Sequence, residues 1–146
     1  MSLNKSTGQK SLYAASYFSP GNVICHFHAG VTEPYANRFT VQIAEAKHIT
    51  LVPEILQYVN HSCSPNAFFD TTLMVLLSLR EIHPGDEITF FYPSTEWDMA
   101  EPFTCNCGSP TCLEVINGAS SLPKETLDKY KLSDFIREMI LQKFSS

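Results

Sequence analysis

Apolar and polar positions alternate over short stretches of the first 92 residues, a pattern typical of β-strands with one buried face. One run, residues 73–79, is almost wholly apolar and suits a strand buried on both sides. Turn-forming residues separate several segments, as at Pro20-Gly21 and at Pro84, Gly85 and Asp86. The pattern predicts strands over residues 11–18, 23–27, 39–43, 47–51, 73–79 and 87–92. We therefore expect a mainly β fold with little helix before residue 92.

The last third of the chain has a different character. Residues 93–121 lack a clear period and are expected to form a loop-like segment. Pro123 can occupy the first turn of a short helix ending near Tyr130, and Ser133 is a good N-cap for a helix over residues 134–143. The apolar residues of that second helix recur at helical spacing and should pack on the body; they are Phe135, Ile136, Met139, Ile140 and Phe144.

Size and composition describe an ordinary globular chain. It has 146 residues, of which 44% are hydrophobic. A chain of this length can bury roughly two-thirds of its unfolded surface, so it does not need disulfides to hold a core. No apolar run approaches the ~20 residues that cross a bilayer, and the polar residues 1–9 lack the apolar centre of a secretory signal. We expect an intracellular protein without a membrane partner: cytoplasmic in a bacterium, cytoplasmic or nuclear in a eukaryote.

Charge is unevenly distributed, although the net charge is only −5. Residues 81–122 contain no Lys or Arg, and their acidic side chains are Glu81, Asp86, Glu87, Glu96, Asp98, Glu101 and Glu114. A nucleic-acid binder should show a basic face, so direct binding of nucleic acid is not expected. The acidic segment is either a solvated loop or a surface that attracts a cationic partner, such as a Lys-rich protein segment.

Five cysteines, an odd number, argue against a disulfide framework in a chain of this kind. Cys105, Cys107 and Cys112 lie within eight residues, so a tight turn could bring three thiolates onto one zinc ion. A closed tetrahedral site needs a fourth ligand, which Cys63, Cys25 or a histidine could supply. The alternative is that the three cysteines are incidental to a loop.

Polar groups are concentrated in residues 60–66, between apolar flanks, so this segment is expected to form a structured loop or turn. A lone histidine in such a place is more often structural than catalytic. Cys63 could act as a nucleophile with His61 as its base, as in a cysteine hydrolase. The spacing of two residues gives that pairing little support, and the reaction would need a free Cys63 thiol.

These segments together resemble one known family. Residues 60–66, Asn-His-Ser-Cys-Ser-Pro-Asn, match the Asn-His-Ser-Cys-x-Pro-Asn motif of the SET-domain protein lysine methyltransferases. Residues 87–92 resemble the second signature strand of that family, which ends in a tyrosine, and the three cysteines of residues 105–112 resemble its post-SET zinc motif. Residues 10–14 resemble its N-terminal segment. The resemblance covers roughly residues 8–113, with the motifs in the order the family has them.

The resemblance implies a SET-domain fold of small curled sheets with a pseudoknot that brings the two signature motifs together. It implies a SET domain over residues 8–95, a post-SET zinc-binding segment over 96–116 and a C-terminal helical tail over 117–146. It also implies that Cys63 joins Cys105, Cys107 and Cys112 on one zinc ion and leaves Cys25 free. A zinc ion closed by four thiolates has no open position, so its role would be structural.

The cofactor that the resemblance implies is S-adenosylmethionine. Its expected contacts are backbone groups of the N-terminal segment, the two polar residues that open residues 60–66, and an apolar side chain flanking the zinc loop that packs on the adenine. In this sequence these are Lys10, Ser11 and Leu12, then Asn60 and His61, then Phe103 or Leu113.

The reaction that the resemblance implies is in-line transfer of a methyl group to the ε-amine of a lysine. Tyr92 would be the catalytic residue, and Phe69, Phe90 and Tyr92 would line the channel that the lysine enters. Phe90 stands where a tyrosine restricts the product in this family, so di- or trimethylation is expected here. The expected partner is a Lys-containing protein or peptide of basic character.

One departure from the family favours an alternative function. The Gly-x-Gly of the cofactor-binding segment reads Gln9-Lys10-Ser11 in this chain, and glycine lets a backbone approach a ligand closely. The alternative is a catalytically weak SET module that binds a basic peptide or partner protein through its acidic segment.

Overall fold

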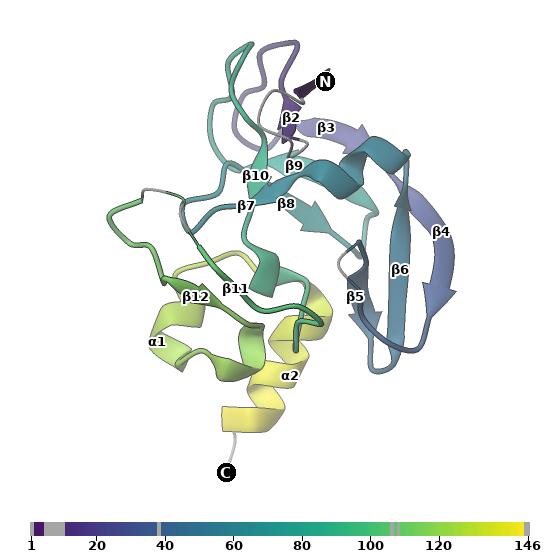
Figure 1. The fold of residues 1–146 in the computed structure, drawn as a ribbon, viewed down its shortest axis with the longest axis vertical. Coiled ribbons are helices and arrows are strands. Elements are labelled where there is room, and N and C mark those ends of the chain that lie inside the picture. The colour runs from purple at the N-terminus through teal and green to yellow at the C-terminus, as the bar shows by residue number, and fades with distance from the viewer. Residues whose placement is uncertain (1, 5–10, 38, 106, 108, 145–146) are drawn as a thin grey trace.

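Small β-sheets make up most of the molecule, as the alternating pattern predicts (Figure 1). The structure is a computed structural model that describes residues 2–4, 11–37, 39–105, 107 and 109–144. Within these ranges, two sheets have three strands and three are pairs of short strands. The strands are β1 (Ser2–Asn4), β2 (Ser11–Tyr13), β3 (Val23–His26), β4 (His28–Glu33), β5 (Val41–Ala44), β6 (Lys47–Val52), β7 (Asn60–His61), β8 (Ala67–Asp70), β9 (Val75–Ser78), β10 (Thr89–Phe90), β11 (Phe103–Thr104) and β12 (Val115–Ile116).

The two three-stranded sheets are antiparallel, with strand orders β3-β9-β8 and β4-β6-β5. Strands β3, β5, β6 and β9 fall in or on the predicted segments. Strands β4 and β8 were not predicted. All six residues of β4 are exposed, so it shows no inside-outside alternation. Strand β8 has three buried residues in a row and follows the polar motif directly. Its sequence therefore shows neither an alternating pattern nor a turn that would indicate where the strand begins.

Strands β7 and β10 pair in parallel and bring the two sequence motifs side by side (Figure 1). Asn60 lies opposite Thr89, and His61 lies opposite Phe90. The predicted strand over residues 87–92 is therefore regular for only two residues, and a 3-10 turn, η2 (Tyr92–Ser94), begins at the tyrosine. Both motifs thus meet at one point, as the predicted SET-domain arrangement requires.

The side chain of Asn66 strengthens this short pairing. Its Nδ2 donates to the Glu87 carbonyl at 2.8 Å, and its Oδ1 accepts from the Thr89 N–H at 2.9 Å. The amide therefore bonds to the neighbouring backbone as another strand would. Asn66 is buried, which makes both bonds important, because an unpaired buried amide is costly.

Aromatic rings connect the core to this crossing point. Phe69 is fully buried and meets Phe27 and Phe90 edge to face, at centroid distances of 5.7 and 4.7 Å. Phe90, on β10, packs in turn against Tyr92 at 4.7 Å. Edge-to-face contacts of this kind add to the stabilisation from apolar burial. The position of Tyr92 is therefore coupled to the packing of the main core.

The segment over residues 93–121, predicted as loop, contains short regular elements instead. Strands β11 and β12 pair antiparallel, and a 3-10 turn, η3 (Ala119–Ser121), follows them. Another 3-10 turn, η1 (Glu54–Tyr58), precedes β7. Strands of two residues are too short to show a period, which is why the sequence pattern did not reveal them.

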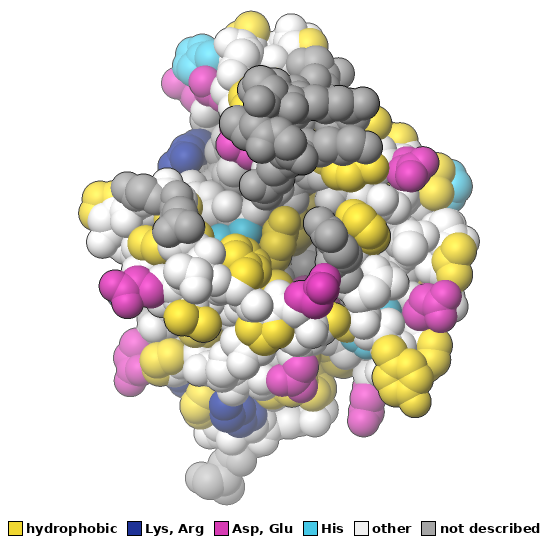
Figure 2. Space-filling view, in the orientation of Figure 1, with side chains coloured by type: hydrophobic (Ala, Val, Ile, Leu, Met, Phe, Trp, Pro, Cys, Tyr) yellow, Lys and Arg dark blue, Asp and Glu magenta, His cyan; other side chains and the backbone are white. Residues whose placement is uncertain are grey.

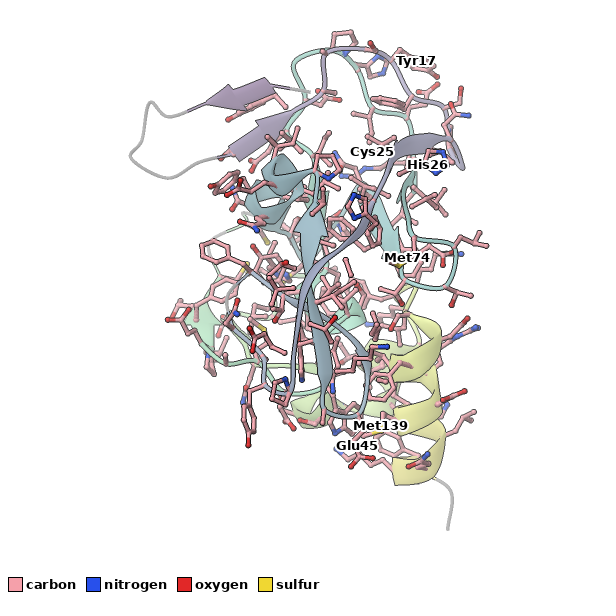
Figure 3. All side chains as sticks on the ribbon, turned by 90° about the vertical axis from the view of Figure 1, so that its right-hand side faces the viewer. Tyr17, Cys25, His26, Glu45, Met74 and Met139 are labelled. Carbon is pink, nitrogen blue, oxygen red and sulfur yellow. The ribbon has the colours of Figure 1, made fainter. Side chains whose placement is uncertain are left out.

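Two helices end the chain close to the predicted positions: α1 (Lys124–Leu127) and α2 (Asp134–Phe144). The Ile136 N–H donates to the Ser133 Oγ at 3.3 Å, which confirms Ser133 as the N-cap. Helix α2 buries Ile136 and Ile140 and lies beside the end of β5, near the turn that carries Glu45 (Figure 3). Neither helix is long or apolar enough to cross a membrane.

Tyr130, between the two helices, fastens this C-terminal segment to the body. Its ring stacks on the buried Phe91 ring at 3.6 Å with an interplanar angle of 3°. Its hydroxyl donates to the Cys63 carbonyl at 2.6 Å. One side chain thus joins the tail both to the segment that ends in Tyr92 and to the first motif.

We expect Tyr130→Phe to lower the free energy of unfolding by about 1–2 kcal/mol, because the buried Cys63 carbonyl loses its donor while the stacking remains. Denaturant titration measures this change. Tyr35→Phe is the matched control, since Tyr35 is 81% exposed and its hydroxyl should contribute little. Equal effects of the two variants would contradict the role assigned to Tyr130.

Candidate functional site

A cleft of about 1170 Å³ opens where the two motifs meet. Its walls come from β5, η1, β7, β10 and the segment between residues 96 and 107. Figure 2 shows this face hollowed near its centre, with histidine and hydrophobic side chains in the hollow and acidic side chains around it. The volume is enough for a drug-sized ligand together with an inserted side chain.

Tyr92 lies in this cleft with its hydroxyl near a backbone carbonyl. The Tyr92 hydroxyl donates to the Val59 carbonyl at 3.3 Å, and the Tyr92 backbone N–H donates to His61 Nδ1 at 3.0 Å. The rings of His61, Phe90 and Phe103 surround it at centroid distances of 4.7 to 5.7 Å. A phenol in such an aromatic setting can orient a small polar group while the rings exclude water.

His61 connects Tyr92 to the cysteine cluster. Because its Nδ1 accepts a backbone N–H, the ring proton must reside on Nε2, which lies 3.4 Å from Cys63 Sγ. Burial lowers the pKa of His61 to about 4, so the ring stays neutral near physiological pH. The nitrogen that faces the sulfur carries a proton, so this geometry does not support Cys63 as a nucleophile with His61 as its base.

Four of the residues expected to contact the cofactor line the cleft: Ser11, Asn60, His61 and Phe103. The Asn60 Nδ2 donates to Ser11 Oγ and to Glu87 Oε2, each at 3.0 Å. The N-terminal segment and the first motif therefore meet at one end of the cleft. This end offers hydroxyl, amide and carboxylate groups to a polar ligand.

The other expected contacts lie elsewhere. Leu12 is fully buried, and its carbonyl accepts the Ile88 N–H at 2.8 Å, so it does not face the cleft. Leu113 packs beside the cysteines, where its N–H donates to Cys63 Sγ at 3.3 Å. Of the two candidates for packing on an adenine, the cleft therefore includes Phe103 but not Leu113. Lys10 lies outside the described residues.

The residues expected to form a lysine channel come together. Phe69, Phe90 and Tyr92 all line the cleft, and the Phe69 ring packs edge to face on Phe90. Phe69 is fully buried and Phe90 is 8% exposed. The three rings form an apolar wall of the cleft, along which a long aliphatic side chain could lie.

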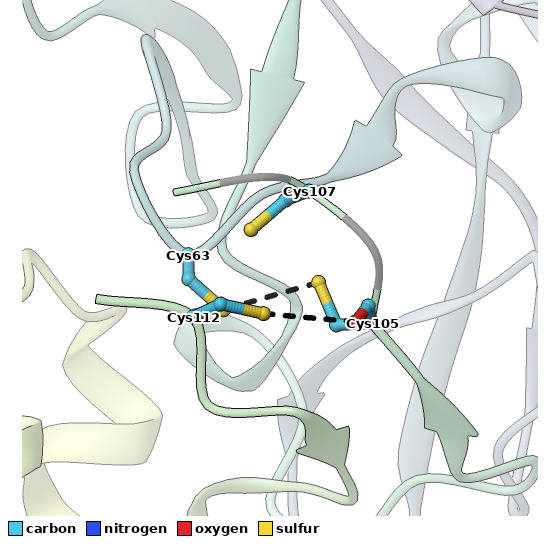
Figure 4. A group of neighbouring side chains, drawn as sticks. All are labelled: Cys63, Cys105, Cys107 and Cys112. Atoms are coloured by element: carbon cyan, nitrogen blue, oxygen red, sulfur yellow. Dashed lines mark hydrogen bonds between the residues drawn. The ribbon is translucent and has the colours of Figure 1, made fainter. Parts of the chain in front are cut away.

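Cys63, Cys105, Cys107 and Cys112 form one cluster (Figure 4), and their sulfur atoms all lie within 4.8 Å of one another. The Cys63 and Cys105 sulfurs are 4.0 Å apart. Four sulfurs around zinc at ~2.3 Å would be about 3.8 Å from each other, so the donor set fits a tetrahedral zinc ion. Cys25 lies apart on β3 (Figure 3), as expected for the cysteine that is left free.

The thiols of the cluster differ in their ionisation. Burial raises the pKa of Cys63 to about 11 and also raises the pKa of Cys105, whereas hydrogen bonds lower the pKa of Cys107 to about 6. Thiols with a raised pKa, such as Cys63 and Cys105, ionise readily only when a metal ion compensates the charge of the thiolates. Cys63 also accepts N–H groups from His61 and Leu113, which would stabilise a coordinated sulfur.

The structure divides the acidic segment into two groups. Glu81, Asp86, Asp98 and Glu114 are exposed outside the cleft, as expected for a solvated loop. Glu87, Glu96 and Glu101 line the cleft. A count of charges along the chain cannot distinguish the two groups. The sequence therefore did not indicate that Glu96, which is 7% exposed, is buried in the wall of the cleft.

Comparison with known proteins agrees with this geometry. Residues 9–93 match the family model described as "SET domain". The chain is 38% identical over 125 residues to "Methyltransferase flvH" of Aspergillus flavus, which covers 84% of this chain and 70% of that protein. It is 32% identical over 100 residues to the "Histone-lysine N-methyltransferase, H3 lysine-36 specific" of Saccharomyces cerevisiae, covering 60% of this chain but only 14% of that protein.

Solved structures share the fold. A crystal structure of KRYPTONITE in complex with mCHH DNA, H3(1-15) peptide and SAH matches with a TM-score of 0.57 at 21% identity, over 75% of this chain and 28% of that one. A second KRYPTONITE structure, with mCHG DNA and SAH, gives a TM-score of 0.58. Together with the family match and the parallel pairing of the two motifs, these findings show that the chain belongs to the SET-domain family of methyltransferases.

Proposed function

We propose that this protein is an S-adenosylmethionine-dependent protein lysine N-methyltransferase. The observation that carries the proposal is the position of Tyr92, whose hydroxyl lies in the cleft 3.3 Å from the Val59 carbonyl, among aromatic rings. Several relatives are named lysine methyltransferases, and the KRYPTONITE structures contain SAH, the product left when S-adenosylmethionine donates its methyl group. These names support the proposal by analogy.

The cofactor would lie at the polar end of the cleft. Ser11, Asn60 and His61 line that end, and Phe103 offers an aromatic face for an adenine ring. Glu87, held by Asn60, adds a carboxylate that can attract a positively charged group. When bound, the cofactor supplies an electrophilic methyl group on a sulfonium centre.

The substrate lysine would enter along Phe90 and Tyr92. Lysine has a reference pKa near 10.4, and only its neutral amine has the lone pair that attacks a methyl group. Burial among aromatic rings disfavours the ammonium form and lowers that pKa. The Tyr92 hydroxyl and the Val59 carbonyl are placed to orient the amine, and such positioning supplies much of the rate in a displacement.

We propose zinc as a structural ion on Cys63, Cys105, Cys107 and Cys112. Four thiolates leave no open position for chemistry, so the ion would hold the segment over residues 103–116 against the first motif. Phe103, which lines the cleft, lies two residues before Cys105. The zinc site would thereby fix one wall of the cofactor pocket.

The alternative, a catalytically weak module that binds a basic peptide, draws support from the acidic cleft lining. Both functions predict affinity for a Lys-containing protein or peptide, and neither requires nucleic acid. Binding of S-adenosylmethionine separates them, and calorimetric titration of the free cofactor measures it. The enzyme should bind the cofactor at physiological concentrations, whereas the module should not.

Tyr92→Phe should reduce kcat for methyl transfer about a hundredfold or more, the typical effect of losing one polarising hydroxyl from a site. The assay follows labelled methyl from S-adenosylmethionine into lysines of a basic protein mixture. Tyr17→Phe, an exposed tyrosine outside the cleft, is the control. Retention of full activity in Tyr92→Phe would disprove its catalytic role.

Mass spectrometry at exhaustion should show di- or trimethyl-lysine, because Phe90 brings no hydroxyl that would hold a water molecule in the channel. Phe90→Tyr should shift the product towards monomethyl-lysine. Phe90 packs on Phe69 and Tyr92, so cofactor binding by the variant must be checked first. Only monomethyl product from the unaltered protein would contradict this prediction.

Metal analysis should find one zinc ion per chain, and Cys112→Ser should lose most of it. We expect chelation to lower Tm by about 10 °C or more, since ligation is coupled to folding and each kcal/mol is worth about 2–4 °C in a domain of this size. Cys25→Ser should keep both zinc and Tm. Unchanged stability after complete removal of zinc would refute the structural role.

A further inference from the structure

Glu96 is held firmly at the edge of the cleft through its neighbours. The Gln42 N–H donates to the Thr95 carbonyl at 2.9 Å, and the Trp97 N–H donates to Gln42 Oε1 at 3.1 Å. The Glu96 carbonyl itself accepts the Ala119 N–H at 2.9 Å. With the backbone fixed on both sides, the direction of the Glu96 side chain is set by the fold.

One oxygen of the Glu96 carboxyl group is buried without a partner. The residue is 7% exposed, and its Oε2 has no hydrogen bond although it is shielded from solvent. In the part of the chain that the structure describes, two other buried side-chain polar atoms also lack partners, on His48 and Ser94, but neither residue lines the cleft. Glu96 does line it, together with Tyr92. An unsatisfied buried carboxyl is costly, so a ligand that supplies a donor would gain from binding there.

The charge of the cleft indicates which kind of donor fits. Among the described residues that line it, Glu87, Glu96 and Glu101 carry carboxyl groups and none is Lys or Arg. Glu87 already accepts a hydrogen bond from Asn60, and Glu101 is exposed. The buried Glu96 is therefore the group with most to gain from a cation entering the cleft.

We propose that Glu96 receives the ammonium group of the incoming lysine side chain and takes its proton, so that the nitrogen reaches Tyr92 as a neutral amine. This role rests on the proposed lysine methyltransferase function. It assigns to this chain a proton acceptor that the sequence motifs do not include.

The step is a simple proton transfer. One N–H bond of the alkylammonium breaks, an O–H bond forms on the Glu96 carboxylate, and the lone pair remains on nitrogen. That lone pair then attacks the methyl group while the bond from carbon to sulfur breaks. The proton leaves Glu96 for solvent when the product departs, which restores the carboxylate.

Burial changes the ionisation of both partners. It raises the pKa of Glu96 well above its usual range, and the same apolar surroundings lower the pKa of a lysine amine. A proton acceptor works best when its pKa lies near the working pH, and burial moves Glu96 in that direction. In a low-dielectric cleft, the neutral pair of acid and amine is also favoured over the ion pair.

The pH profile of kcat/KM distinguishes this role from a structural one. Glu96→Gln should reduce kcat/KM about a hundredfold at pH 7, and the deficit should shrink to a few-fold as pH nears 10.4, where lysine in solution is already half neutral. Other titratable groups in the cleft are present in both proteins and cancel in the ratio; they are Tyr58, His61, Glu87, Tyr92, Glu101, Cys105 and Cys107. A deficit that is constant with pH would overturn the proposal.

Control variants distinguish the loss of a proton acceptor from a loss of folding or of negative charge alone. Glu45→Gln removes the same charge from an exposed turn outside the cleft (Figure 3) and should leave kcat/KM unchanged. Glu96→Asp keeps a carboxyl group and should recover part of the activity at pH 7. Circular dichroism and cofactor titration establish that each variant is folded.

A binding experiment tests Glu96 without relying on methyl transfer. The probe is n-butylammonium, which has the end group of a lysine side chain, and the neutral control is n-butanol. Calorimetric titration should show that n-butylammonium binds the unaltered protein about tenfold more tightly than it binds Glu96→Gln, whereas n-butanol should bind both proteins alike.

The two experiments keep the proposals distinct. If the protein methylates lysine while Glu96→Gln behaves like Glu45→Gln, the function stands and the role of Glu96 is refuted. If no lysine is methylated but n-butylammonium binding depends on Glu96, the cation site stands and the proposed reaction fails. Equal or undetectable binding of n-butylammonium to both proteins would refute the cation site.

Discussion

The parallel pairing of β7 with β10 is the contact on which the rest of the site depends. Each strand has only two residues, too few for backbone hydrogen bonds alone to hold them together in water. Side chains stabilise the pairing further: Asn66 bonds to the Glu87 carbonyl and to the N–H of Thr89, the first residue of β10, and His61 accepts the N–H of Tyr92. Asn66 is buried and the other groups are partly buried, so leaving one of these bonds unmade would be costly. The position of Tyr92 therefore depends on a few partly buried polar bonds more than on any extended sheet.

The same pairing joins the cleft to the cysteine cluster. The neutral ring of His61 accepts from Tyr92 on one side and faces Cys63 with its proton on the other. Tyr130 adds a second connection, because its hydroxyl reaches the Cys63 carbonyl while its ring covers Phe91. Order in the cysteine cluster and order at Tyr92 are thus physically coupled. A metal ion that never touches a substrate can still determine whether the cleft is correctly formed.

The sequence predicts those parts of this arrangement that short-range chemistry controls. Ser133 caps α2 because a hydroxyl before an apolar helical period satisfies a free N–H, and that signal is local. The motifs predict that His61 and Tyr92 meet, but only through resemblance to a family, since the contact spans 31 positions. Strand β4 is wholly exposed and β11 has only two residues, so neither has a detectable period. The burial of Glu96 could not be predicted either, because the residues on both sides of it, Thr95 and Trp97, bond to Gln42, far away in the sequence.

The acidic segment acts at two ranges. Its exposed carboxylates contribute a negative field that would attract the proposed basic partner; such an attraction is weak at any one residue and is screened by salt. Inside the cleft the attraction is stronger, because little water is left to screen the charge of Glu96. A nearby ammonium group would therefore either be held strongly or give up its proton to the carboxylate. The proposed lysine methyltransferase would need both effects, because a lysine is captured from water as a cation but reacts only as a neutral amine. Surface carboxylates, together with the buried Glu96 in the same cleft as Phe90 and Tyr92, would meet these two requirements within a segment of about forty residues.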